Sequence, residues 1–257
     1  MSSRTVSRRW YRFAYHAPRE KDRESQPHQL RDGDAALFLA PVLQAKGYSF
    51  GGPLFNYAHP QQDPAPPLVD LDHGFLQPED LILLTTHPPM NDVDDQVRRP
   101  PMRSFTTLED KIFAALRRHF SHCSRSHVIV SEEHARQFPR VALHRNKEFK
   151  VYRQPQRVEA TAAYMAYEDH AWPGGPALLA AFSMGGTETL VWTYWLGKRF
   201  PHLVAAAPFV MAEMVKRPLP KEPLSMSFAD EWDIELLTGG GPISFPGAHE
   251  SSRKVSF

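Results

Sequence analysis

Residues 176–211 carry the signals that identify the fold class, and they read PALLAAFSMGGTETLVWTYWLGKRFPHLVAAAPFVM. The run 176–182 is apolar, of strand length and bounded by glycine pairs, which favours a buried strand over a helix. Residues 187–200 repeat apolar side chains at three- and four-residue steps until a proline ends the pattern. A second apolar run of strand length, 203–211, follows. The stretch therefore predicts a β-α-β unit with Ser183 at the exit of its first strand.

The segment Ala181-Phe182-Ser183-Met184-Gly185-Gly186 resembles the nucleophile elbow of the α/β-hydrolase superfamily, in which a serine sits in a tight turn between strand and helix. Trp192, nine positions after the serine, is similar to the homoserine acetyltransferase branch, and residues 199–204 resemble that superfamily's passage into the next strand. Two features depart from the pattern. Ala181 stands where glycine is commonest, and the helix is about one turn longer than usual.

The resemblance implies a serine hydrolase or acyltransferase acting on an ester or acyl donor. Ser183 would be the nucleophile, and the backbone N–H of Met184 would be one oxyanion donor. The superfamily's chain order is serine, acid, histidine, and the residues after the serine offer Asp230 or Asp233 as the acid and His249 as the base. The interval from Asp230 to His249 is shorter than an intervening helix and strand normally need.

The second oxyanion donor is the weak part of the enzyme hypothesis. The earlier strand at 81–86 is followed by His87-Pro88-Pro89, and proline has no N–H to donate. Met90 or another loop would have to substitute, because one missing donor costs roughly 3 to 4 kcal/mol of transition-state stabilisation. The structural alternative is that Ser183 caps the following helix by bonding an N–H near Gly186.

Strands and helices alternate between residues 80 and 211, which predicts an α/β fold with a mostly parallel sheet and helices on both faces. Its three layers would be α/β-hydrolase-like or Rossmann-like. The expected strands are 81–86, 127–131, 149–153, 176–182 and 203–211. The expected helices are 107–120, 132–138, 158–169 and 187–200, and 35–45 forms a short helix or strand.

Three regions follow from the composition: a basic N-terminal segment at 1–34, an α/β domain at 35–211 with a proline-rich insertion at 53–79, and an extended tail at 212–257. The 24 prolines among 257 residues are well above the usual share of about 5%. Much of the chain is therefore expected to be neither helix nor central strand.

Charge and cysteine content exclude several classes of protein. With 30 basic and 29 acidic residues, the chain gives no reason to expect a nucleic-acid partner. A single cysteine, Cys123, allows no intrachain disulfide and suits a reducing, intracellular compartment. No apolar run reaches the length of a transmembrane helix. Residues 1–18 carry four arginines and no acid, which resembles a mitochondrial targeting segment, although a disordered basic tail gives the same composition.

Four potential metal ligands lie within nine residues: His119, His122, Cys123 and His127. Their spacing fits neither a Cys-x2-Cys pair nor a His-x3-His helical pair with a matching second half. No metal and no cofactor are therefore expected.

Two classes of function remain: the serine enzyme, and a non-catalytic α/β domain that serves as an accessory subunit of a larger assembly. The second is preferred because segments 53–79 and 212–257 hold isolated large apolar residues in extended chain, a pattern typical of segments that grip other protein subunits. These residues are Leu54, Phe55, Tyr57 and Phe75 in the first segment, and Met226, Phe228, Trp232, Ile234, Leu236, Leu237, Ile243 and Phe245 in the second.

Overall fold

The computed structural model describes residues 9–16, 30–57, 76–85, 107–123, 128–137, 160–217, 229 and 231–238. Nine strands lie within these residues: β1 (Arg9–His16), β2 (Tyr48–Tyr57), β3 (Leu81–Leu84), β4 (Phe120–Cys123), β5 (Val128–Val130), β6 (Ala160–Glu168), β7 (Ala177–Ser183), β8 (Phe209–Lys216) and β9 (Trp232–Leu236). The helices among them are α1 (Leu30–Ala45), α3 (Thr107–Leu116), α4 (Glu132–Gln137) and α6 (Gly186–Lys198).

Seven strands form one sheet in the order β2-β1-β3-β7-β6-β8-β9. The β1–β2, β1–β3 and β3–β7 pairs are parallel, and the β6–β7, β6–β8 and β8–β9 pairs are antiparallel. Strands β2, β1, β3, β7 and β8 therefore run in one direction, while β6 and β9 run in the other. The α/β class with a mostly parallel, mixed sheet is confirmed.

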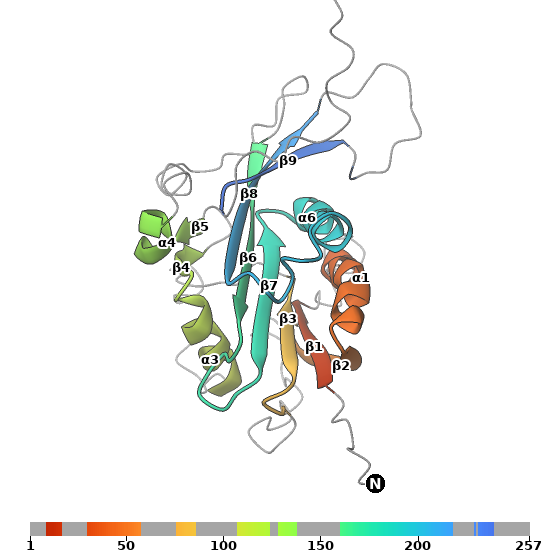
Figure 1. Ribbon diagram of the computed structural model, residues 1–257, viewed down its shortest axis with the longest axis vertical. Coiled ribbons are helices and arrows are strands. Elements are labelled where there is room, and N and C mark those ends of the chain that lie inside the picture. Colours follow the sequence, from red (N-terminus) through yellow and green to blue (C-terminus); the bar gives the residue numbers. More distant parts are fainter. Residues whose placement is uncertain are drawn as a thin grey trace, which may run out of the picture.

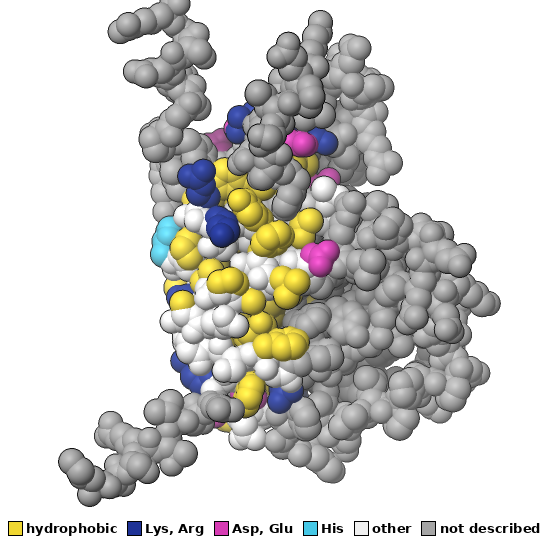
Figure 2. Space-filling view, turned by 90° about the vertical axis from the view of Figure 1, so that its right-hand side faces the viewer, with side chains coloured by type: hydrophobic (Ala, Val, Ile, Leu, Met, Phe, Trp, Pro, Cys, Tyr) yellow, Lys and Arg dark blue, Asp and Glu magenta, His cyan; other side chains and the backbone are white. Residues whose placement is uncertain are grey.

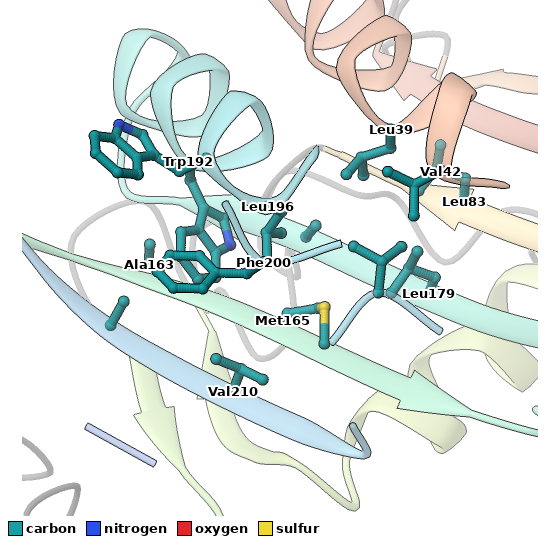
Figure 3. Packing of buried hydrophobic residues seen from close by; sticks show 14 of the residues in the cluster. Leu39, Val42, Leu83, Ala163, Met165, Leu179, Trp192, Leu196, Phe200 and Val210 are labelled. Carbon is teal, nitrogen blue, oxygen red and sulfur yellow. The ribbon is translucent and has the colours of Figure 1, made fainter. Parts of the chain in front are cut away.

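Helices cover both faces of the sheet, with α1 and α6 on one side and α3, α4 and the β4–β5 ribbon on the other (Figure 1). Strand β3 shows why two layers are needed, since all four of its residues are fully buried. Leu81 and Leu83 face the α1–α6 cluster, whereas Ile82 and Leu84 face the α3 cluster. Figure 3 shows Trp192 and other side chains of the α1–α6 layer packed over the sheet.

The predicted helix at 158–169 is wrong, because residues 160–168 form β6 in the middle of the sheet. The alanine-rich sequence ATAAYMAYE has good helix propensity, but β6 pairs with β7 and β8 along both edges. Its side chains are apolar on both faces, with Tyr164 in the α3 cluster and Met165 in the α1–α6 cluster. A strand buried on both faces lacks the apolar–polar alternation that identifies a half-buried strand.

The predicted strand at 203–211 is displaced. Residues 201–206 are turns, with Ala205 at a φ of 48°, and strand β8 begins only at Phe209. The backbone N–H groups of Ala206 and Ala207 both bond the carbonyl of Leu203, which closes these turns locally. Strand β8 runs in the direction of β7, as a β-α-β unit requires, but β6 lies between them.

Other expectations are confirmed in type with shifted bounds. Strands at 81–86 and 176–182 and helices at 132–138 and 187–200 correspond to β3, β7, α4 and α6, and 35–45 lies within helix α1. The predicted 127–131 strand exists as β5, but it pairs only with β4 in a separate antiparallel ribbon. Helix α3 ends at Leu116, and the last predicted helical residue, Phe120, opens β4 instead. The predicted strand at 149–153 lies outside the described residues.

Both terminal segments of the sequence supply strands to the sheet. Strand β1 lies between β2 and β3, and the buried carboxylate of Asp80 accepts hydrogen bonds from the backbone N–H groups of Trp10 (3.0 Å) and Gln77 (3.1 Å). Strand β9 pairs with β8, and Trp232 is only 3% exposed within the α1–α6 cluster. Ile234, Leu236 and Leu237 are buried in the same way, so the expectation that these four residues are isolated contacts for other subunits is wrong: they pack on this chain's own core. None of the described helices is long and apolar enough to span a membrane.

Candidate functional site

The elbow-like segment places Ser183 at the last position of β7, three residues before α6 begins. Its side chain is only 1% exposed. The hydroxyl donates a hydrogen bond to the backbone oxygen of Ala162 on β6 at 2.7 Å, and the backbone N–H donates to Thr189 Oγ1 at 2.9 Å. The serine is therefore bonded to the sheet through its hydroxyl and to the first turn of α6 through its backbone N–H.

Trp192, the other residue that carries the acyltransferase resemblance, has a similar role. Its indole Nε1 donates to the backbone oxygen of Tyr164 at 2.9 Å, and the side chain is fully buried. Tyr164 lies two residues beyond Ala162 on β6. Ser183 and Trp192 together supply two side-chain donors to carbonyls of the same strand, at the point where β7 ends and turns into α6.

The backbone around Ser183 is unstrained. A nucleophile elbow holds its serine in a sharp, strained strand-to-helix turn that presents the hydroxyl. Among the non-glycine residues that the structure describes, Ala205 alone has a positive φ, and the helix N-cap, Gly185, is extended at φ −138°. The turn thus follows the elbow's sequence pattern without its strained geometry.

The start of α6 is occupied by a carboxylate. Glu188 lies in the first turn, and a Cβ placed on Gly185 would meet Glu188 Oε2 at 2.3 Å. A negative charge at this position interacts favourably with the helix dipole. It would repel a second negative oxygen, such as the oxyanion of a reaction intermediate. Met184, the expected oxyanion donor, is half-buried and packs against the α3 cluster.

The alternative in which Ser183 caps α6 is wrong. No side chain caps the N-terminus of this helix, and the Ser183 hydroxyl bonds β6 instead. The physical reason is that β7 ends one residue too early to cover Ala162, so the carbonyl of this residue needs a donor.

The other members of the expected triad are distributed as follows. Asp230 and His249 lie outside the described residues, as do His87, Pro88, Pro89 and Met90. Asp233 is described, and it lies exposed on β9 with its Oδ1 3.0 Å from Arg217 Nε. Strands β7 and β9 are three strand spacings apart, about 14 Å. The structure therefore does not bring Asp233 to Ser183.

A second cluster of titratable side chains lies on the opposite face of the sheet. His119, in the turn after α3, has its Nδ1 2.8 Å from Nε2 of His134 on α4. Its Nε2 lies 2.9 Å from Glu168 Oε1, without the alignment of a hydrogen bond, and Glu168 Oε2 pairs with Arg118 Nη1 at 2.5 Å. The Phe209 ring stacks on His134 with centroids 4.0 Å apart.

Burial controls the charge of this cluster. Burial, then the neighbouring His134 and Arg118, lowers the pKa of His119 to about 3. Burial also lowers the pKa of His134, partly opposed by Glu133, and raises the pKa of Glu168 against the effect of Arg118. Both imidazoles are therefore neutral at pH 7, and one of them donates to the other. With His119 and His134 exposed by 4% and 8%, the arrangement can share a proton and fix α4 to the sheet, but it is closed to a substrate.

The expected absence of a metal centre concerns His119, His122, Cys123 and His127. The described residues contain no group of three or more His, Cys, Asp or Glu side chains that could hold an ion, and His127 lies outside them. Burial raises the pKa of the Cys123 thiol, so it is not a ready thiolate ligand. The true partners of His119, namely His134 and Glu168, were missed from sequence because Glu168 was placed on a helix that is a strand.

The chain was also compared with known proteins. No protein-family model, no curated protein and no solved structure matches it.

Proposed function

We propose that this chain is a non-catalytic α/β domain that acts as an accessory subunit of a larger protein assembly. The observation that carries the proposal is the hydrogen bond from the buried Ser183 hydroxyl to the Ala162 carbonyl. A nucleophile must instead offer its proton to a base and reach a substrate. Freeing this hydroxyl would leave a buried carbonyl without its donor, at a cost of about 1 to 3 kcal/mol.

The outer surface of the α1–α6 layer supports the subunit role. Helix α1 has no charged residue between Asp34 and Lys46, and α6 has none between Glu188 and Lys198. Figure 2 shows hydrophobic side chains gathered along the middle of this face. Leu37 on α1 is 66% exposed. An uncharged helix surface with exposed apolar side chains is normally covered, so this face suits contact with another protein chain.

In this proposal the elbow-like residues 181–186 are a structural remnant of an α/β-hydrolase-like domain, and segments 53–79 and 212–257 contribute further subunit contacts outside their sheet strands. A mitochondrial location is part of the same proposal, with one constraint. Removing residues 1–18 as a leader would delete β1 from between β2 and β3, so β1 is expected to stay on the mature chain.

Two measurements test the proposal. A fluorophosphonate probe is expected not to label the full chain, with a known serine hydrolase as the positive control. In native extract the chain is expected to migrate in a complex of constant composition, and Leu37→Lys is expected to shift it toward the free form. Ala114→Lys, an exposed change on α3 at the opposite face, serves as the matched control. Stoichiometric labelling that Ser183→Ala abolishes would make the enzyme hypothesis the better one.

A further inference from the structure

Strand β2 is an edge strand of the sheet that the described residues form. It occupies the end of the strand order, and within the described part of the chain no strand pairs with its outer side. Its ten residues, YSFGGPLFNY, include no charged side chain. Natural edge strands are commonly protected by charge, especially lysine, because an unprotected row of backbone donors and acceptors recruits another strand. Two features protect this edge in part: Pro53 removes one donor from the ladder, and the register against β1 shifts twice between Phe50 and Phe55.

The side chains beside this edge are also suited to contact. Phe50 is 50% exposed and lies 5.5 Å from Tyr11, ring centroid to ring centroid, on the face that carries α1. Helix α1, which contacts β2, presents the uncharged stretch 35–45 on the same side. A strand added next to β2 would cover Phe50 and extend the apolar layer beneath α1.

We propose that β2 pairs antiparallel with β2 of a second copy of this chain, so that the two seven-stranded sheets become continuous across a two-fold axis. Only the residues at the axis meet their own copies, and a charge there would oppose a like charge. The absence of charge from 48 to 57 on β2 and from 35 to 45 on α1 meets this condition. The charges nearest to this edge belong to β1, where Arg12 donates to the Gly51 carbonyl and Arg9 lies over the Tyr48 ring.

The inference does not depend on whether Ser183 is catalytic, although it shares the uncharged stretch 35–45 of α1 with the proposed subunit contact. It predicts that the purified full chain has twice the 29.3 kDa mass of one copy in light scattering at micromolar concentration. Phe50→Lys replaces the half-exposed ring beside the edge with a charge that pairing would have to desolvate, and it is expected to weaken the dimer about tenfold or more. Ala114→Lys on α3 is expected to leave the dimer unchanged. Circular dichroism confirms that each variant is folded.

A distance measurement locates the interface. The chain's one cysteine, Cys123, is fully buried, so Ser49→Cys provides a single reactive thiol on the exposed start of β2. Antiparallel pairing of two ten-residue strands keeps the two copies of position 49 within about 30 Å, at about 3.3 Å per residue. Spin labels there should show this separation. A monomer, a dimer insensitive to Phe50→Lys, or labels much farther apart would each overturn the inference, whereas loss of the larger assembly alone would contradict only the proposed function.

Discussion

The Ser183 hydroxyl and the Ala162 carbonyl are joined by a 2.7 Å hydrogen bond that crosses from the end of β7 to β6. The bond is buried and continues the pairing of two strands beyond the last backbone rung between them. It assigns the serine of an enzyme-like motif to the stability of the sheet.

Ser183→Ala should therefore act on stability. The substitution leaves the buried Ala162 oxygen without this donor, and the free energy of unfolding should fall by about 1 to 3 kcal/mol. Urea denaturation monitored by tryptophan fluorescence measures the change. Ser49→Ala, an exposed serine on β2, should stay within about 0.5 kcal/mol of the parent. Equal effects from both variants would argue that the Ser183 bond contributes little.

Stability should also fall as the pH falls below about 6.5, the unfolded pKa of histidine. The folded pKa values of His119 and His134 are lowered, so the unfolded chain binds protons that the folded chain does not, and folded His119 takes its proton only near pH 3. His119 contributes a slope of about 1.4 kcal/mol per pH unit between these two pKa values, and His134 adds to the loss with the same sign. Glu168, whose pKa is raised, has the opposite sign and partly offsets the loss.

Replacing both histidines, as His119→Leu with His134→Leu, should flatten the dependence of unfolding free energy on pH between about 6.5 and 4. The groups that face the pair are Arg118 after α3, Glu133 on α4 and Glu168 on β6, and all three remain in the variant. Denaturation curves at several pH values provide the test. An unchanged slope would place the acid sensitivity elsewhere in the chain.

Asp80→Ala should release the start of β1. The buried carboxylate holds the Trp10 and Gln77 backbone N–H groups, and its loss leaves two donors without this acceptor. We expect a loss of about 2 to 5 kcal/mol, and faster amide hydrogen exchange in residues 9–16 than in β7. Asp80→Asn retains one acceptor oxygen and should lie between the parent and the alanine variant. Uniform exchange across the whole sheet would contradict this local role.

Gly197→Ala should separate the two helices of the α1–α6 layer. A Cβ at this position would lie 2.4 Å from the backbone oxygen of Phe38 on α1, and a backbone atom cannot move aside as a flexible side chain can. The gain in helix propensity from alanine is about 1 kcal/mol, so a net loss of stability would show that the close approach dominates. Thermal unfolding of the variant measures the sign directly.

How far the sequence predicts this fold depends on how locally each element is specified. Strand β7 and helix α6 carry their own boundaries, because glycine pairs flank the strand and a proline follows the helix, and both were found close to their true positions. Strand β6 has no such boundaries and is rich in alanine, and its conformation is set by the strands on each side. Local propensity therefore predicted a helix where tertiary pairing produces a strand.

The candidate site shows the same division. The motif around Ser183 identifies a buried turn. The acceptor of the Ser183 hydroxyl lies on β6, and the sequence does not predict this strand. The pairing of His119 with His134 and Glu168 joins three elements from different parts of the chain. Spacing along the sequence could suggest His119 as a residue of interest, but it could not supply those partners.

The register of the sheet's centre has a consequence for how the protein is made. Leu81 of β3 pairs with Ala177 of β7. These two strands can therefore meet only after roughly a hundred further residues have left the ribosome. Until then β1, β2 and β3 have no central neighbour, and the uncharged β2 is accessible to other nascent chains. Folding is therefore expected to be slow and to depend on chaperones during synthesis.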